Sequence, residues 1–472
     1  MKRILISTLL VSACGFAGTS FAAAAVEKVI VRQQWPWSAD VKVEYKLTGV
    51  TTPVNIGVTA YDGETELPPI PESAMRGDRY GVSGDGVGQF VIDPVAAFGT
   101  ERLTFANFSV KLSLTASDPS ESDVLYKVLD LTNFTTKDIT RADFHNGKMG
   151  TYETDYGKIG EVNGQKYSTL LEDVLIWTGI TNMPEYKLTK LAMRRIPAKD
   201  VTYQMGTHAG DWTYCGFAGT HDVTLKSDFY LSVFEVTEKQ MNRLISVNGV
   251  DGVIPGVSSP TWHGDPLPVG AMNYRFLRGV PQDYSNWPAD IYEVSSDSAI
   301  QKIRNNFPGM TFDVPTEAQW EYACRAGTVW PLYCGIPQQA ATLSTEQYLA
   351  LLRPLAWTGG QGESIPLEAE LNQHQLGGLK HPNAFGLYDM LGNQWETCRD
   401  LVLGSPTAIT TPAVEPLIND MAENKDAQYV MTRGGSYYNN YAYALAARRA
   451  WVPMAHYSWA HLGFRLFLKC DE

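Results

Sequence analysis

The sequence NAFGLYDMLGNQWE, residues 383–396, gathers turn residues, aromatic side chains and two carboxylates in one short stretch. Gly386 and Gly392 permit backbone conformations that are closed to most other residues. Asp389 and Glu396 add anionic oxygens, and the aromatic residues between them can be buried around the loop. A loop of this kind meets the needs of a hard cation, which prefers oxygen ligands. The stretch is therefore the first place to look for a site.

The composition is that of a folded protein with room for two or three domains. The chain has 472 residues, of which 44% are hydrophobic and only 19% are charged. Its many glycines and aromatic residues resemble those of extracellular, loop-rich proteins. The formal net charge of −13 would repel phosphate at long range. Nucleic acid is therefore not an expected partner.

The N-terminus has the layout of a secretory signal. A basic start is followed by an apolar run and then by small residues, so we expect residues 1–25 to be removed and the protein to be exported to the periplasm, the cell surface or the medium. Cleavage after Ala22 fits the small-residue rule. The alternative is a bacterial lipobox that would leave Cys14 as a lipid-modified first residue. No other stretch reaches about 18 uninterrupted apolar residues, which predicts no transmembrane span.

The remaining cysteines are odd in number and show no CxxC spacing. In an exported protein they are compatible with one or two disulfides, whose pairing the sequence does not reveal. They are Cys215, Cys324, Cys334, Cys398 and Cys470.

The chain divides into three parts after the signal. Residues 26–117 carry short alternating apolar segments separated by Gly and Pro, a pattern that predicts a small antiparallel β-sandwich. Residues 118–188 mix strand-like pieces with a polar run and are expected to connect the domains. Residues 189–472 form the second globular part.

Capping residues predict three helices in the second part. Thr237 and Gln240 form a capping box that predicts a helix to about residue 246. A second helix is expected over residues 298–306. A third begins at Thr316, with Gln319 returning the capping bond, and ends at the glycine of position 327.

Five segments together resemble a known family, the sulfatase-modifying-factor or formylglycine-generating-enzyme-like domain. Their order and spacing match over roughly residues 189–469, and they are long and chemically irregular, which makes the resemblance specific. The segments are EVTEKQ (235–240), VPTEAQWEY (314–322), the stretch at 383–396, RGGS (433–436) and GFRL (463–466).

The resemblance implies an α+β fold related to C-type lectins, here preceded by the β-sandwich. It also implies a structural calcium ion. The ligands by position are the carboxylates of Asp389 and Glu396 and the backbone carbonyls of Met390, Gly392 and Gln394. Alternating carbonyls with a carboxylate at each end suit an oxygen site of about 6–8 ligands. The alternative is a turn without metal in which Glu396 pairs with an arginine such as Arg433.

Copper chemistry is not expected. The resemblance implies an oxidase that holds copper on two cysteines after the RGGS segment, but those positions are Asn439 and Ala444 here, and no cysteine occurs between Cys398 and Cys470. Cu(I) prefers sulfur ligands. A copper site formed by Cys398 and Cys470 is the less favoured alternative.

The segment after RGGS is rich in arginine and aromatic residues, where the resemblance implies a peptide groove. Stacking planes and guanidinium groups can hold a peptide, a protein segment or a glycan. The residues expected to bind such a ligand are Arg433, Ser436, Asn439, Arg448 and Trp451. His456 and His461 are expected to line the groove rather than to bind a metal.

Two functions follow from the sequence. The first is an exported, calcium-stabilised binding or accessory module without copper-dependent formylglycine formation. The second is an active oxidoreductase of the same superfamily that modifies sulfatases or another protein.

Overall fold

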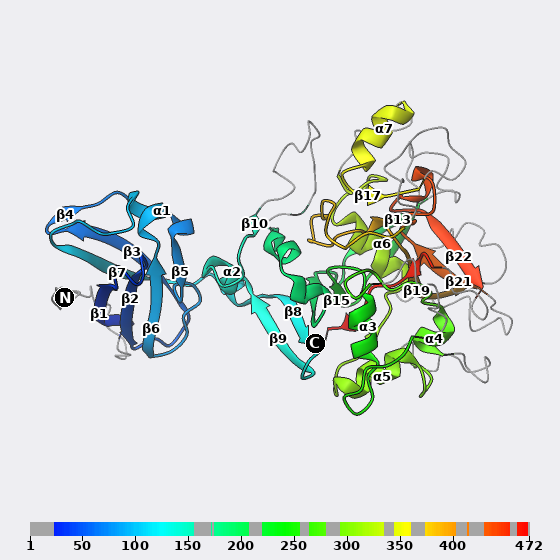
Figure 1. The fold of residues 1–472 in the computed structure, drawn as a ribbon, viewed down its shortest axis with the longest axis horizontal. Coiled ribbons are helices and arrows are strands. Elements are labelled where there is room, and N and C mark those ends of the chain that lie inside the picture. Colours follow the sequence, from blue (N-terminus) through cyan, green and yellow to red (C-terminus); the bar gives the residue numbers. More distant parts are fainter. Residues whose placement is uncertain are drawn as a thin grey trace. The chain divides into compact units, whose positions relative to one another are not determined.

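The structure, a computed structural model, describes residues 23–154, 171, 174–206, 220–254, 264–279, 293–334, 344–359, 373–402, 413–414, 429–453 and 460–470. Most of the expected signal, with Cys14, lies outside these ranges, as do Cys215 and His456. The chain forms two compact units. One comprises Met1–Leu125 with Ile139–Tyr152, and the other comprises Tyr126–Asp138 with Glu153–Glu472. Each is described by itself (Figure 1).

The first unit contains two antiparallel sheets that share one core. One sheet has the order β1-β2-β6-β5, from Ala25–Gln33, Val41–Thr48, Gly86–Ile92 and Met75–Gly77. The other has the order β4-β3-β7, from Thr65–Glu66, Val54–Asp62 and Phe108–Ala116. In β2 every second residue is buried, as the alternating sequence predicted. Helices α1 (Pro94–Phe98) and α2 (Arg141–His145) complete the unit.

The second unit is built around a six-stranded sheet whose strands come from distant parts of the chain. Its order is β16-β24-β15-β12-β8-β9. The strands span Phe312–Asp313, Phe467–Lys469, Phe229–Ser232, Lys190–Ile196, Val124–Asp130 and Thr135–Thr140. The hairpin β8–β9 comes from residues that the sequence suggested were a connecting region. That region therefore supplies part of the main sheet, as well as α2 of the first unit.

A four-stranded sheet contains parts of three of the five segments, those at 383–396, 433–436 and 463–466. Its order is β22-β21-β19-β23, from Arg449–Pro453, Tyr429–Arg433, Trp395–Val402 and Leu462–Gly463. Smaller sheets pair β13 (Thr202–Gly206), β14 (Thr220–Thr224) and β20 (Ala413–Val414), and separately β17 (Ala356–Trp357) with β18 (Leu391–Gly392), and β10 (Glu153–Thr154) with β11 (Leu175–Ile176).

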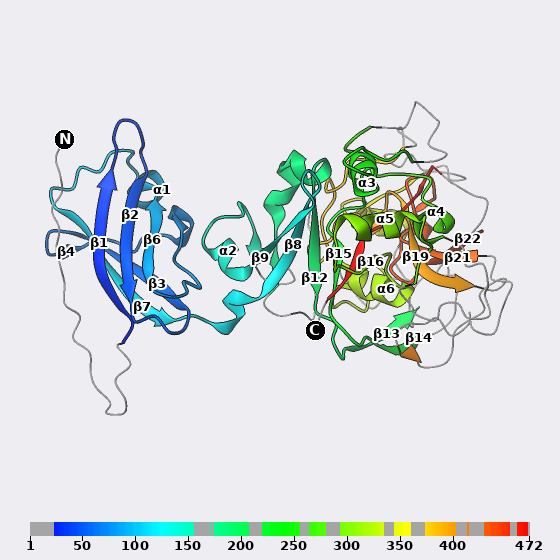
Figure 2. The same cartoon turned by 90° about the horizontal axis from the view of Figure 1, so that it is seen from below.

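The three predicted helices of the second unit are confirmed. They are α3 (Glu238–Leu244), α5 (Ala299–Asn306) and α6 (Glu317–Arg325), and the capping boxes of α3 and α6 form as expected. Two helices were not predicted, α4 (Tyr274–Arg278) and α7 (Thr345–Leu352). Helix α6 is buried along its whole length and packs against β13, β19 and β21 (Figure 2).

The structure also bears on the cysteines and on membrane insertion. Within the described residues, Cys324, Cys334 and Cys398 are buried free thiols. None of the helices in the described ranges combines the length and the apolar character needed to cross a bilayer.

Candidate functional site

Two of the segments, VPTEAQWEY and RGGS, meet in a buried network of charges around α6. Arg433, at the end of β21, forms ion pairs with Glu317 (2.9 Å) and Glu321 (2.7 Å) on consecutive turns of this helix. Arg449 also binds Glu317, and Arg325 binds Glu321 at 2.8 Å. Although burial alone would raise it, the pKa of Glu321 is lowered to about 2 by the two arginines. The network joins a helix and two strands from distant parts of the sequence.

This placement changes the expectation for two predicted ligand-binding residues. Arg433 and Ser436 are fully buried. The guanidinium of Arg433 is engaged by the two glutamates and by the carbonyl of Ala446 at 2.9 Å. It therefore holds the sheet to α6 and is not presented to a ligand at the surface.

The loop at residues 383–396 has the unusual backbone that its glycines predicted. Gly392 has a φ of +76°, and a Cβ there would lie 2.3 Å from the carbonyl oxygen of Trp357 in the neighbouring strand. Asp389 and Asn393 also adopt positive φ, at 56° and 57°. Side chains other than glycine adopt this conformation at a cost, so the surrounding contacts must hold it.

Glu396 takes the alternative that the sequence left open, with a different arginine. Its Oε1 accepts a hydrogen bond from Arg465 Nε at 2.7 Å, and its Oε2 accepts one from Trp320 Nε1 at 2.6 Å. Arg465 belongs to the GFRL segment, so the stretch at 383–396 and the last segment meet here, and Arg433 is not the partner. Burial outweighs the arginine and raises the pKa of Glu396 to about 6.

Asp389 is the acidic residue of the loop that keeps a carboxylate oxygen without a hydrogen bond. Its Oδ2 accepts a hydrogen bond from Gly378 N at 2.7 Å, whereas Oδ1 is buried without a hydrogen-bond partner. A third buried carboxylate, Glu235, accepts from Gln394 N at 2.9 Å and from the side chain of Asn393. Burial, followed by repulsion from Asp389 and Glu396, raises the pKa of Glu235 well above its usual value.

These observations allow a test of whether the loop fits calcium. In its favour are the orphaned oxygen of Asp389, the cluster of buried carboxylates, and the carbonyl oxygens of Met390 and Gln394, which would lie 3.2 and 3.7 Å from a Cβ added at Gly434. Against it, both oxygens of Glu396 are already engaged. Within the described residues no three acidic, histidine or cysteine side chains are placed to hold a metal ion. The loop thus fits a cation through Asp389 and carbonyls, with Glu396 the least suited of the proposed ligands.

The two positions where the resemblance implies copper thiolates are occupied by residues with other roles. Asn439 Oδ1 accepts hydrogen bonds from Trp395 Nε1 at 2.7 Å and from Ser436 Oγ at 2.6 Å. Ala444 is fully buried in the core. Cys398 lies in β19 and is fully buried, and this burial raises the pKa of its thiol well above the usual value. It is therefore held as a neutral thiol, which is a poor metal ligand.

An aromatic surface surrounds Asn439. Tyr438 stacks on His461 with ring centroids 4.9 Å apart and planes 8° from parallel. Arg448 lies over the ring of Tyr443, with its guanidinium carbon 4.4 Å from the centroid. Burial lowers the pKa of His461 to about 4, so this ring is neutral near pH 7.

We define the aromatic surface as the half-buried residues of this region. It includes three of the five residues predicted to bind a ligand, Asn439, Arg448 and Trp451, together with His461. The aromatic surface comprises Tyr438, Asn439, Tyr443, Arg448, Trp451 and His461.

Two residues near the site had no role assigned from the sequence. His374 Nδ1 lies 2.9 Å from Gln394 Nε2, and its ring packs edge-on against Tyr437. Glu235 was noted only as the start of a motif. Its position directly before a capping box gave no sign that the side chain turns inward to bind the backbone at Gln394. The contact joins residues that are 159 positions apart in the sequence.

Comparison with known proteins identifies the family. Residues 186–470, more than half of the chain, match the family described as sulfatase-modifying factor enzyme 1-like domain. The chain belongs to this family. Together with the mixed helices and sheets, the match confirms the predicted α+β class and the formylglycine-generating-enzyme-like fold.

Among similar proteins are two formylglycine-generating enzymes. The one from Mus musculus is 26% identical over 324 residues, covering 61% of this chain and 77% of the relative. The one from Bos taurus is 25% identical over 308 residues, covering 58% and 74%. A chaperone protein LppX from Paenibacillus barcinonensis is 28% identical over 190 residues, covering 38% and 63%. Among solved structures, PvdO from Pseudomonas aeruginosa is 19% identical with a TM-score of 0.41, covering 59% of this chain and 94% of that one.

Proposed function

We propose that this protein is an exported binding or accessory module of the sulfatase-modifying-factor family that does not form formylglycine with copper. The observation that carries the proposal is the pair Asn439 and Ala444 at the two thiolate positions. An amide oxygen that already accepts two hydrogen bonds and a buried methyl group offer Cu(I) none of the soft ligands it prefers.

The aromatic surface supports a binding role. Its six residues are half-buried, so they are held in place by packing and remain partly accessible. A peptide or protein segment can stack on the rings and hydrogen-bond to the polar groups. The relative that is named a chaperone protein is consistent with a partner that is itself a protein.

Calcium is part of the proposal as a brace for the loop at 383–396. Asp389 with the carbonyls of Met390, Gly392 and Gln394 would hold the ion, and Glu396 would join them only by sharing its oxygens with Arg465 and Trp320. The ion would offset the repulsion among the buried carboxylates and would fix the strand β18 beneath the aromatic surface.

The alternative function is catalytic. Two relatives are named formylglycine-generating enzymes, and this favours an oxidoreductase acting on a protein. Such an enzyme would need a metal or cofactor arrangement other than the two thiolates that the resemblance implies.

The two functions are separated by one assay with two readouts. The purified chain is incubated with copper, reductant, oxygen and a cysteine-containing sulfatase peptide, and mass spectrometry follows conversion of the cysteine to formylglycine. We expect no conversion. Binding is measured in parallel on an immobilised library of unstructured peptides.

We expect a subset of these peptides to bind to the original chain. The Trp451→Ala variant should lose this binding. The matched control is Trp37→Ala, which removes a tryptophan from the first unit that is 88% exposed. Catalytic turnover of the sulfatase peptide would overturn the proposal. Equal binding by both tryptophan variants would also overturn it, because the aromatic surface would then have no part in recognition.

A further inference from the structure

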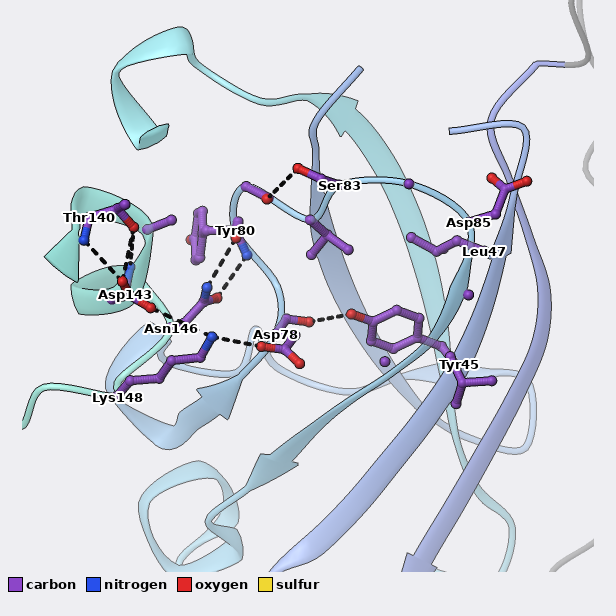
Figure 3. Close-up of a pocket in the computed structure, with 17 residues that line it drawn as sticks. Tyr45, Leu47, Asp78, Tyr80, Ser83, Asp85, Thr140, Asp143, Asn146 and Lys148 are labelled. Atoms are coloured by element: carbon purple, nitrogen blue, oxygen red, sulfur yellow. Dashed lines mark hydrogen bonds and ion pairs between the residues drawn. The ribbon is translucent and has the colours of Figure 1, made fainter. Parts of the chain in front are cut away.

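The first unit contains a polar cavity that the family relationship does not explain. Its volume is about 360 Å³, at the lower end of the range of roughly 300–1,000 Å³ for small-ligand pockets. One wall is the glycine-rich segment 81–88, and the opposite wall comes from residues 140–148 at α2 (Figure 3). Tyr45 of β2 and Asp78, which follows β5, form the floor. All of these residues belong to the first unit.

The shape of the cavity follows from close backbone contacts. Tyr45 pairs with Gly88 across β2 and β6, and a Cβ at position 88 would lie 2.2 Å from the tyrosine oxygen. Only a residue without a side chain lets the ring lie across the strand in this way. A Cβ at Gly81 would approach Ala142 of α2 to 3.1 Å, so the two walls meet closely at that end.

The polar groups of the cavity are held in fixed positions before any ligand arrives. Tyr45 Oη donates to the carbonyl of Asp78 at 2.6 Å, and Lys148 Nζ binds the Asp78 carboxylate at 2.8 Å. The amide of Asn146 accepts from the backbone of Arg79 and Tyr80, both at 2.8 Å, and donates to the Tyr80 carbonyl at 3.0 Å. Figure 3 shows the bonds of Tyr45, Asn146 and Lys148 to Asp78 and Tyr80, in the segment that directly follows β5. Such preorganisation reduces the entropy lost on binding.

The charges of the cavity restrict the class of ligand. Asp78, Asp85 and Asp143 line it together with one cation, Lys148, which lies 3.7 Å from Asp143. The excess of carboxylates disfavours phosphate, sulfate and acidic sugars, and the lysine in the same space disfavours polyamines. The predominance of polar groups along the walls disfavours an apolar ligand.

The lining combines hydrogen-bond donors and acceptors with the half-buried ring of Tyr80. Carboxylates and backbone carbonyls accept hydrogen bonds, Lys148 donates, and the hydroxyls of Ser83 and Thr140 do both. A molecule with many hydroxyl groups, each able to donate and accept, matches such a surface, and a C–H face can pack on the half-buried ring of Tyr80. We propose that this cavity binds a neutral saccharide unit.

Saturation-transfer NMR on the full mature chain tests the proposal. The neutral probes are glucose, cellobiose, maltose and chitobiose, and the charged probes are glucuronate and spermidine. We expect at least one neutral saccharide to give a signal and the charged probes to give none. Ser83→Trp places a large ring at the exposed rim of the cavity and should abolish the signal.

The matched control is Ser73→Trp, an equally exposed serine of the same unit that does not line the cavity. It should retain the signal, and circular dichroism should show both variants folded. The proposal fails if no neutral saccharide gives a signal, if the two tryptophan variants behave alike, or if glucuronate or spermidine binds in a manner that Ser83→Trp removes.

Discussion

At the scale of single residues, charged side chains of the family segments form buried ion pairs with one another. Glu317 and Glu321 of α6 bind Arg433, and Glu396 binds Arg465, all with side chains that are almost completely buried. Charges removed from water in this way depend on their partners, because a buried charge left alone is costly. The arginines therefore specify how the motifs assemble.

Replacing Arg433 tests this interpretation. Arg433→Met leaves Glu317 and Glu321 with less compensation in the interior and should lower the free energy of unfolding by about 3–5 kcal/mol. Arg353→Met is the control, because this arginine is partly exposed and its pair with Glu346 is 3.5 Å long. Its cost should be at most about 1 kcal/mol. Urea denaturation measures both, and a small cost at Arg433 would contradict a framework role.

Asp400 gives a prediction on pH. Burial, followed by repulsion from Glu317, raises its pKa from the usual 3.8 to about 7 in the folded chain. The folded protein thus holds a proton that the unfolded chain releases near pH 4. The stability that this group contributes is present below pH 4 and is lost as the pH rises through about 7, with a total on the order of 3–4 kcal/mol.

The neutral variant Asp400→Asn should escape this loss. Its free energy of unfolding, relative to the original chain, should increase between about pH 4 and 7 and level off at higher pH. The asparagine retains an acceptor for the Glu317 N–H, which Asp400 Oδ2 accepts at 2.5 Å. Denaturation at several pH values measures the difference, and a difference that is constant or falls with pH would show that Asp400 is ionised in the folded state.

At the scale of elements, the loop at 383–396 first drew notice as a place for an active site, and its geometry gives it a supporting role. Its strand β18 pairs with β17, and Gly392 N donates to Gly434 O at 2.8 Å, so the loop bonds directly to the RGGS segment. Anything that orders the loop also orders the start of the aromatic surface. This is the physical reason to expect a bound cation to affect stability.

Calcium binding should be visible in thermal unfolding. Chelation should lower the midpoint of the original chain, because an ion that binds only the folded state stabilises it. Asp389→Ala removes the carboxylate with the orphaned oxygen and should abolish the difference between calcium and chelator. Asp251→Ala, at an exposed acid, should keep it. If the midpoint of the original chain responds to neither calcium nor chelator, the proposed calcium site is wrong.

At the scale of the whole molecule, local sequence signals predicted local structure and little else. The capping boxes at Thr237 and Thr316 located two helices, whereas α7 was missed although Ser344 and Gln347 form the same box. The family resemblance predicted the α+β fold. The strand order of the main sheet was beyond reach, because neighbours such as β15 and β24 are far apart in the sequence and their register depends on tertiary packing.

The site shows the same division. The sequence predicted the loop, its glycines and the missing thiolates, because these depend on residue identity at fixed spacing. It assigned Arg433 to a ligand, since exposure depends on which face of a strand meets α6. The partner of Glu396 is Arg465, in the segment between β23 and β24, and not Arg433 of β21, because such a pairing depends on tertiary packing.

The most direct test of the account is a Cu(I) titration against a competing chelator. We predict no tight site in the purified mature chain, and a new tight site in the double variant Asn439→Cys, Ala444→Cys, which restores both thiolates and shows that the assay detects such a site. A tight 1:1 Cu(I) site in the original chain that disappears in Cys398→Ser would contradict the account, because this protein would then hold copper by another arrangement.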